Sequence, residues 1–479
     1  MSNPEGAVDG GRGRAGVFVI FGITGDLAKK MTFRSLYRLE RRGLLDYPLI
    51  GVAADEWTVD QLMDRARSAI ADTGEELDED VFARFASRWS YLAGDVTTPE
   101  VYRRLGEEMA RVRVQRRPGA LFYLEMPPSL FGTIVEHLAQ AGLTEGASIA
   151  VEKPFGHDLE SARALNERLH RAVDEGQLLR VDHFLGKEPV IELEFMRFAN
   201  LALSRLWDRD SVTCIQITLG ETFGVEDRGH FYDPVGALRD VVQNHLMQVL
   251  ALVTMDPPTG ASDDDLRDKK SEVFRAMPAV LASEAVRGQY SGYRRIDGVA
   301  DGSTTETFIA LKLAIDNWRW EGVPVFIRAG KRLAATATEV RLFLRNTPRL
   351  PFLPGLDSAA DNQVVLRIDP DAAMRLELVA YDDGTWKKVP LETAFARELG
   401  EPLEPYERLL HAALTGDHRL FARQDAVEET WRVLEPLIDA PPAVVEYAPG
   451  SWGPPEADDL VSGYPSWQEP WLGEPGLPD

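Results

Sequence analysis

The sequence is poor in cysteine and in long apolar runs. Cys214 is the single cysteine among 479 residues, so no intrachain disulfide can form. No Cys/His cluster has the spacing of a metal site, and we expect none. No apolar run approaches the roughly 20 residues that a membrane span requires. Residues 1–16 are rich in glycine and lack the apolar core of a signal peptide, so we expect a disordered tail there and a cytoplasmic protein.

Positive charge is also scarce. The chain has 53 Lys and Arg against 77 Asp and Glu, a formal net charge of −24. Such an excess of acids argues against nucleic acid or an anionic membrane as a bulk partner. An acidic protein that binds an anion must do so with local cations. The Lys and Arg residues inside motifs are therefore more informative than the total.

The first part of the chain alternates short apolar strands with helical patterns. We expect helices such as residues 27–45, and strands at residues 17–21, 49–53, 121–124 and 148–151. Continuous apolar strands that alternate with helices predict a parallel sheet covered on both faces. We therefore expect an α/β, Rossmann-like doubly wound domain over residues 17–181, with a dinucleotide as its ligand.

The pattern changes after about residue 200. Only a few helices intervene, such as residues 235–253 and 405–413, between candidate strands at 212–219, 305–314, 323–329, 339–344, 364–368 and 374–380. These strands often alternate apolar and polar residues, which is typical of an antiparallel sheet with one solvated or partner-facing side. We expect an α+β substrate and oligomerisation domain over residues 182–479. The tail from Pro454, rich in Pro, Gly and Trp, is expected to lie over the surface.

A glycine turn follows the first predicted strand. Gly22 and Gly25 open the first helix, in the order Gly22-Ile23-Thr24-Gly25-Asp26-Leu27. Glycine lets the backbone approach a ligand, and a helix N-terminus offers N–H groups to a diphosphate. The spacing is G-x-x-G and not the full G-x-G-x-x-G, so a plain strand-to-helix turn is the alternative.

Polar side chains follow two further strands. Lys153, before Pro154, is placed at the carboxyl edge of the predicted sheet, where ligands bind, and a cis peptide is possible there. A loop lysine is the alternative. An apolar run at 178–181 ends in Asp182 and His183, with Lys187 close behind, which indicates a buried strand that delivers polar groups to a cleft. The alternative is a solvated strand end with an ion pair.

A helical segment, RDVVQNHL (residues 239–246), carries a polar face. Asp240 and His245 are five positions apart, which rotates them away from each other on a helix of 3.6 residues per turn. Asp240 is therefore a poor orienting partner for His245, and Asp182 is a better candidate. Farther along, residues 328–332 place cations at the end of a predicted strand. Glu221 adds a carboxylate in a predicted loop.

Together these segments resemble the glucose-6-phosphate dehydrogenase family. The motifs are GITGDLAKK (22–30), EKPFG (152–156), RVDHFLGKE (180–188), RDVVQNHL (239–246) and VPVFIRAGKRL (323–333), in the family order. The resemblance implies a Rossmann domain and a larger β+α domain, in a homodimer or homotetramer. It implies oxidation of glucose 6-phosphate at C1 to a 6-phosphoglucono-lactone, with hydride transfer to NAD or NADP, in the oxidative pentose phosphate pathway.

The resemblance also assigns roles to residues. His245 matches the base and Asp182 the carboxylate that orients it. His183 and Lys187 match contacts to the substrate phosphate, and the sugar contacts are Glu221, Asp240 and Lys331. Lys153 matches a residue that reaches both substrate and cofactor. The remaining cofactor positions are Gly22, Thr24, Gly25, Asp26, Leu27, Ala54 and Asp55.

Three positions depart from the family pattern. Phe184 stands where the family usually has Tyr, and Thr336 where a basic residue is common. Ala54, followed by Asp55, stands where an Arg often holds the 2′-phosphate of NADP, so we expect NAD to be used well. Two alternatives stay open: a dehydrogenase of another sugar or sugar phosphate, and a non-catalytic dinucleotide-binding protein that senses or assembles.

Overall fold

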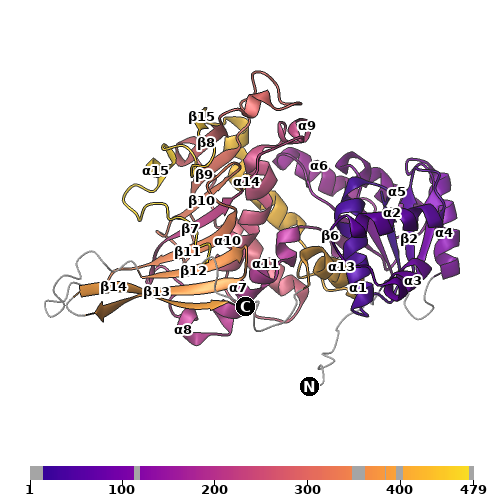
Figure 1. Ribbon diagram of the computed structural model, residues 1–479, viewed down its shortest axis with the longest axis horizontal. Helices are drawn as coiled ribbons and strands as arrows, with labels where there is room; N and C mark the ends of the chain where they lie inside the picture. Colours follow the sequence, from indigo (N-terminus) through magenta and orange to yellow (C-terminus); the bar gives the residue numbers. More distant parts are fainter. Residues whose placement is uncertain (1–14, 113–118, 348–361, 383–384, 395–402, 474–479) are drawn as a thin grey trace. The chain divides into compact units, whose positions relative to one another are not determined.

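The computed structural model describes residues 15–112, 119–347, 362–382, 385–394 and 403–473. Within these ranges the chain divides into two compact units (Figure 1). Unit 1 contains the chain up to Gly156, Glu160–Gly186 and Leu403–Gln424. Unit 2 contains His157–Leu159, Lys187–Pro402 and the chain from Asp425 onward. The predicted division after residue 181 thus lies five residues early, and unit 1 has a third segment.

Unit 1 is built on a six-stranded parallel sheet. Its order is β3 (Trp89–Ala93), β2 (Leu49–Ala53), β1 (Ala15–Phe21), β4 (Gly119–Leu124), β5 (Ser148–Val151) and β6 (Leu178–Arg180). The order reverses between β1 and β4, and such a switch point is where doubly wound sheets bind ligands. The predicted α/β fold class is confirmed.

Helices cover both faces of this sheet because its strands are apolar on both sides. Phe18 and Ile20 of β1 join one core with residues of α1 (Phe33–Arg41), α2 (Val59–Ala71) and α3 (Glu79–Ser87). Phe21 instead stacks on Tyr102 of α4 (Pro99–Val112). The other helices are α5 (Phe131–Gln140), α6 (Leu159–His170), and the short 3₁₀ turns η2 (Pro128–Leu130) and η3 (Glu175–Gln177).

Two local predictions for unit 1 need correction. Strand β1 begins at Ala15, so the last two residues of the expected tail belong to the sheet; residues 1–14 lie outside the described residues. The helix expected at 27–45 is a π-helix, η1 (Ala28–Thr32), followed by α1, which ends at Arg41. Gly43, with φ +72°, takes the chain out of the helix.

The segment Leu403–Gln424 packs in unit 1, although the sequence placed it in the second domain. Helix α13 (Pro405–Thr415) buries Leu409 and Leu414 in the same core as Leu36 and Leu39 of α1. An ion pair of 2.7 Å joins Arg38 Nε of α1 to Glu407 Oε1 of α13, and both side chains are almost fully buried. The contact spans more than three hundred residues of sequence, so local patterns could not reveal it.

Unit 2 contains a nine-stranded sheet. Its order is β14 (Thr385–Ala394), β13 (Ala373–Asp382), β12 (Gln363–Asp369), β11 (Ala337–Leu344), β7 (Val212–Gly220), β10 (Val325–Gly330), β9 (Phe308–Leu313), β8 (Ala285–Tyr290) and β15 (Val444–Tyr447). All neighbouring pairs are antiparallel except β7–β10 and β8–β15. The predicted mainly antiparallel sheet is confirmed; β8, β14 and β15 were not predicted.

Helices and the C-terminal tail complete unit 2 (Figure 1). The helices are α7 (Glu188–Phe198), α8 (Leu201–Ser204), α9 (Gly229–Tyr232), a π-helix η5 (Leu238–Leu246), α10 (Met247–Thr254), α11 (Asp263–Arg275), α14 (Gln424–Asp439), α15 (Ala457–Leu460) and the 3₁₀ turns η6 (Ala282–Glu284) and η7 (Tyr293–Arg295). The tail lies against the sheet: Gln216 of β7 donates to the carbonyl of Pro465, and Arg328 of β10 lies over the rings of Trp452 and Trp467.

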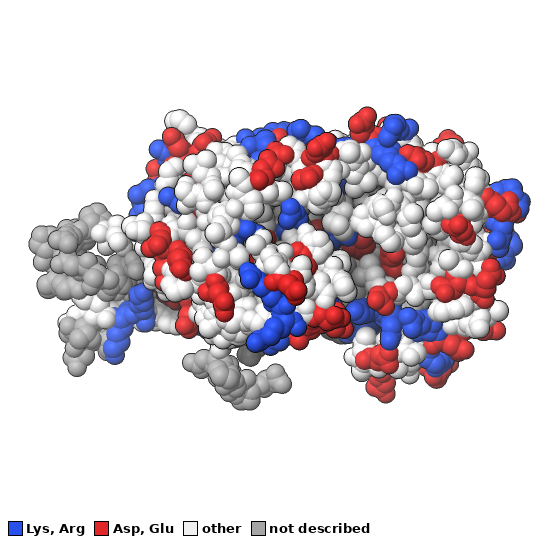
Figure 2. All heavy atoms as spheres, turned by 90° about the horizontal axis from the view of Figure 1, so that it is seen from above, with Lys and Arg blue, Asp and Glu red and all other residues white. Residues whose placement is uncertain are grey.

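Charge is mixed on the surface. On the face drawn in Figure 2, acidic and basic side chains are interspersed. The cations that could bind an anionic ligand must therefore be identified one by one. Among the described residues, no helix combines the length and the apolar character needed to cross a membrane.

The buried pair between Arg38 and Glu407 generates a stability prediction. Glu407→Ala should lower the free energy of unfolding by about 3 kcal/mol, because it leaves the buried guanidinium with less compensation. Urea denaturation at neutral pH measures the change. The matched control is Glu107→Ala, which breaks the exposed ion pair with Arg103 and should cost less than about 1 kcal/mol. Equal effects of the two substitutions would contradict the role of α13 in holding unit 1 together.

Candidate active site

The glycine turn lies at the carboxyl edge of the unit 1 sheet. Gly22 has φ +82°, and a Cβ atom there would lie 2.3 Å from the carbonyl oxygen of Glu125. The N–H of Gly25 donates to the carbonyl of Gly22 at 2.9 Å, which closes the turn before η1. Backbone that can be approached this closely fits the diphosphate of a dinucleotide. The turn also contains Thr24, Asp26 and Leu27.

The end of β2 carries exposed acids and no cation. Ala54, Asp55 and Glu56 are exposed, and the hydroxyl of Tyr91 donates to the backbone carbonyl of Asp55 at 2.6 Å. Burial, together with the charges of Asp55 and Glu56, raises the pKa of Tyr91 to about 12. Lys29, from the glycine-turn motif, forms an ion pair of 3.3 Å with Asp72.

Lys153 follows β5 at the same edge of the sheet. The peptide bond between Lys153 and Pro154 is cis, the isomer that the sequence left open. The preceding residue, Glu152, is buried and accepts a hydrogen bond of 2.5 Å from the hydroxyl of Tyr123.

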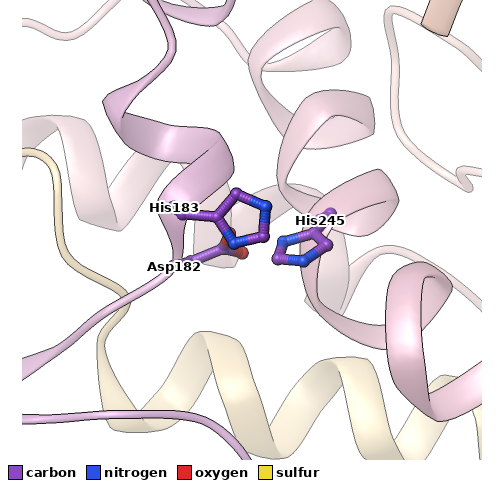
Figure 3. Close-up of side chains that lie close together, drawn as sticks. All are labelled: Asp182, His183 and His245. Carbon is purple, nitrogen blue, oxygen red and sulfur yellow. The ribbon is translucent and has the colours of Figure 1, made fainter. Parts of the chain in front are cut away.

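Asp182 and His183 follow β6 and begin the short helix η4 (His183–Gly186), where Figure 3 shows their side chains. Asp182 is buried, and its Oδ1 accepts a hydrogen bond of 2.9 Å from the N–H of Phe184. The ring of His183 stacks on Tyr406 of α13, with centroids 6.4 Å apart and planes at 9°. Phe184 is buried, and its ring contacts the ring of His183, with centroids 5.3 Å apart.

Unit 2 carries His245 on the π-helix η5 (Figure 3), and the side chain is buried. The angular argument against Asp240 as its partner assumed 3.6 residues per turn, which does not apply to η5. In a π-helix the backbone bonds run from residue i to i+5, which brings positions five apart into near alignment. Asp240 is nevertheless engaged elsewhere: its Oδ2 lies 3.7 Å from Nζ of Lys331.

Lys331 is the centre of a charged cluster in unit 2. Its ammonium lies 2.5 Å from Oε2 of Glu221, which follows β7, and also faces Asp240 on η5. It lies over the rings of Phe223 and Tyr232, at 5.3 and 5.2 Å from their centroids. The structure thus brings together all three residues predicted to contact the sugar. The two aromatic walls were missed by sequence reasoning.

Lys187 precedes α7, and its Nζ lies 2.6 Å from Oδ2 of Asp369 at the end of β12. Asp369 is 182 positions away in sequence, and no motif pointed to it. Thr336 has a structural contact: its hydroxyl oxygen accepts a hydrogen bond of 3.0 Å from the N–H of Thr222. The loss of a basic residue at this position is thus accompanied by a link between two loops.

A cavity of about 620 Å³ lies at the other edge of the unit 1 sheet. Its lining includes Ala15, Gly119 and Ser148, the first residues of β1, β4 and β5. Open α/β sheets bind ligands at the carboxyl ends of their strands, so this cavity does not qualify as the site.

A parallel sheet with a glycine turn at its switch point, followed in sequence by a mostly antiparallel sheet, is the architecture of a nicotinamide-dependent oxidoreductase with a second, substrate-binding unit. Comparison with known proteins agrees. Residues 19–192 match the family model "Glucose-6-phosphate dehydrogenase, NAD binding domain", and residues 194–468 match "Glucose-6-phosphate dehydrogenase, C-terminal domain". The chain belongs to the glucose-6-phosphate dehydrogenase family.

Individual relatives are similar over almost the whole chain. Glucose-6-phosphate 1-dehydrogenase 1 of Mycobacterium tuberculosis is 59% identical over 465 residues, which cover 97% of this chain and 98% of the relative. The crystal structure of glucose-6-phosphate 1-dehydrogenase from Mycobacterium avium superposes with a TM-score of 0.91 at 59% identity, covering 96% of this chain and 100% of that one. A glucose-6-phosphate dehydrogenase in complex with glucose 6-phosphate gives 0.88 at 31% identity, covering 96% and 99%.

Proposed function

We propose that the protein oxidises glucose 6-phosphate at C1 to 6-phosphoglucono-1,5-lactone, with hydride transfer to NAD or NADP. The observation that carries the proposal is the cluster of Lys331 with Glu221 and Asp240, which offers one cation and two carboxylates to a polyhydroxylated ligand. The relative solved with glucose 6-phosphate supports the same substrate. With 59% identity to curated glucose-6-phosphate 1-dehydrogenases, a different sugar or a non-catalytic role has no support.

His245 is the proposed general base. Loss of hydride from C1 requires loss of the proton from the C1 hydroxyl, and a neutral imidazole can accept that proton near neutral pH. The bound nicotinamide supplies the hydride acceptor. Asp182 is the proposed carboxylate that orients and stabilises the imidazolium, and its own orientation is fixed by the N–H of Phe184.

Several cations serve the substrate in this proposal. Lys187 and His183 contact the 6-phosphate, while Glu221, Asp240 and Lys331 contact the sugar hydroxyls. Lys153, which follows β5 at the carboxyl edge of the unit 1 sheet, reaches substrate and cofactor. Asp369 already binds the ammonium of Lys187. A phosphate therefore has to share this ammonium with the carboxylate of Asp369 or displace the carboxylate from it. Lys187 is therefore positioned before the ligand arrives.

The cofactor site is proposed to accept NAD well. The ribose hydroxyls of NAD are normally bound by an acid after the second strand, and the 2′-phosphate of NADP by an Arg. Here Ala54 and Asp55 stand at that place and are exposed. The proposed contacts to the diphosphate come from the backbone of Gly22, Thr24, Gly25, Asp26 and Leu27.

A second copy of the chain is the proposed protein partner, in a homodimer or homotetramer. Strands β13 and β14 expose Leu378, Val389 and Leu391, by 40 to 55% each, and the strand register places these three on one face. An apolar patch at the end of a sheet favours burial against another surface. Sedimentation velocity measures the oligomeric state, and a monomer at micromolar concentration would exclude the proposal.

We also propose a cytoplasmic location, in keeping with a single, buried cysteine.

The substrate assignment predicts a phosphate-specific defect in Lys187→Ala. A hydrogen bond to a charged group contributes roughly 1.5–3 kcal/mol, so KM for glucose 6-phosphate should rise about tenfold or more. The KM for the cofactor should change little. Nicotinamide absorbance with glucose 6-phosphate, beside free glucose, measures both. The phosphate role is wrong if the variant keeps its KM for glucose 6-phosphate and loses affinity for glucose.

The base assignment predicts a loss of turnover in His245→Ala. Removal of a general base should lower kcat about 10²- to 10⁴-fold while substrate binding is largely retained. Asp182→Asn should also lower kcat, because it disturbs the orientation and charge of the imidazole. Steady-state kinetics with circular dichroism as a folding check is the measurement. A folded His245→Ala variant with near-normal kcat is incompatible with the assignment.

The cofactor assignment predicts efficient use of NAD and a gain for NADP in Ala54→Arg. A guanidinium at this place can bind the 2′-phosphate with two parallel hydrogen bonds. The measurement is kcat/KM for both cofactors at one ionic strength, in the wild type and the variant. A strong NADP preference in the wild type that Ala54→Arg leaves unchanged would show that this loop does not decide cofactor choice.

A further inference from the structure

Two glutamates stand side by side at the carboxyl edge of the unit 1 sheet. Glu125 directly follows β4, and Glu152 directly follows β5. The strands pair in register, with Leu124 opposite Val151, so the two glutamates occupy the next pair of positions and share one face of the sheet. Tyr123, two positions before Glu125, lies on that face and donates its hydroxyl to Glu152.

Glu152 is buried, and Glu125 is half-buried with its carboxyl oxygen Oε2 shielded from solvent. Glu125 Oε1 accepts a hydrogen bond from the hydroxyl of Thr32, at the end of the π-helix η1. Its other oxygen, Oε2, is buried and has no hydrogen-bond partner among the described residues. An ionised carboxylate with a buried, unsatisfied oxygen is costly, whereas the protonated acid is tolerated. The geometry therefore favours a neutral Glu125.

The surroundings of Glu125 and Glu152 raise the pKa of both carboxyl groups and so also favour their neutral forms. Burial, helped by the charge of Glu152 and opposed by the hydroxyl of Thr32, raises the pKa of Glu125 to about 8. Burial raises the pKa of Glu152 to about 7 against the hydrogen bonds of Tyr123 and Tyr406 and the charge of Lys153. Two neighbouring acids cannot both ionise easily. Glu125 thus changes charge at mildly alkaline pH.

This titration occurs next to the glycine turn. The N–H of Glu125 donates to the carbonyl of Phe21, the last residue of β1, and the carbonyl of Glu125 is the atom that leaves no room for a side chain at Gly22. Thr32 belongs to the helical segment that the turn opens. Glu125 therefore contacts β1 through its backbone and the segment after the glycine turn through its carboxyl group. Both contacts lie at the switch point between β1 and β4, where a doubly wound sheet binds a diphosphate.

We propose that Glu125 is a proton-dependent element of the dinucleotide site. In its neutral form it leaves the glycine turn receptive to an anionic diphosphate. When it ionises, the carboxylate and the diphosphate repel each other through the poorly polarisable interior of unit 1, and the dinucleotide binds more weakly. The inference rests on the proposed function, because it assumes that the dinucleotide occupies this turn.

The sign of the pH dependence follows from the raised pKa. Below neutral pH Glu125 stays protonated, and affinity is highest. As the pH rises through about 8, the proton is lost and affinity falls. One additional negative charge beside the ligand should weaken binding about three- to tenfold. The pKa of Glu152 is also raised by burial, so its ionisation adds to the fall, and Lys153 beside it opposes the change.

The test is a direct binding titration without substrate. NAD is the probe, because its diphosphate stays fully ionised throughout the range. Calorimetry at one ionic strength, at about pH 6 and about pH 9.5, spans the transition of a group that titrates near 8. The Kd of the wild type should rise about three- to tenfold between these values. Glu125→Gln keeps the shape and removes the ionisable group, so its Kd should rise clearly less than that of the wild type between the two pH values.

Two further variants make the test specific. Glu145→Gln changes the net charge equally at the far edge of the sheet, where Glu145 is exposed, and should keep the wild-type pH dependence. Thr32→Val removes the hydrogen bond that favours ionised Glu125, so the midpoint of the transition should move to higher pH.

The outcomes separate this inference from the proposed function. A wild-type Kd that is the same at both pH values, or an unchanged pH dependence in Glu125→Gln, would overturn the role of Glu125 while the site stands. If Glu125→Gln fails to fold, the Thr32→Val variant decides. The role of Glu125 is then overturned if the midpoint of the pH dependence of the Kd is the same in this variant as in the wild type. Absence of NAD and NADP binding at either pH would instead overturn the proposed dinucleotide site itself.

Discussion

The close approach of Gly22 to the carbonyl of Glu125 is the constraint on which unit 1 depends. A side chain at Gly22 would overlap that carbonyl, at 2.3 Å from Cβ, and its φ of +82° suits glycine alone. The approach is possible because β1 and β4 are neighbours at the switch point of the sheet. It brings the start of η1 to the carboxyl ends of the strands that also carry Glu125, Glu152 and Lys153.

Burial of charge is the second constraint. In a protein with a net charge of −24, the functional cations of unit 2 are each held by a carboxylate, Lys331 by Glu221 and Lys187 by Asp369. Such pairing fixes a flexible side chain before a ligand binds, at the cost that the ligand must compete for the cation. In unit 1, burial raises the pKa of Glu125 and Glu152, against the hydrogen bonds that hydroxyl groups donate to them.

Both proposed sites contain a π-helical segment, η1 after the glycine turn and η5 around His245. Such segments are uncommon and occur frequently at functional sites. In η5 the wider turn changes which side chains share a face. Apolar periodicity does not separate a π-helix from an α-helix over so few residues, because the difference lies in which carbonyl each N–H reaches. This is why the sequence predicted a helix here and could not show its π-helical hydrogen bonds.

The sequence by itself determined the local features: apolar strands that end in Gly22, Lys153 and Asp182, the change to a mainly antiparallel pattern, and the five ordered motifs of the family. These depend on residues close together in the chain, whose periodicity and turn chemistry are visible without a structure. Only the tertiary structure decided that α13 belongs to unit 1, that Asp369 holds Lys187, and that Glu125 lies beside Glu152. Each of these joins segments far apart in sequence, and their partners are selected by packing and by the desolvation of charge.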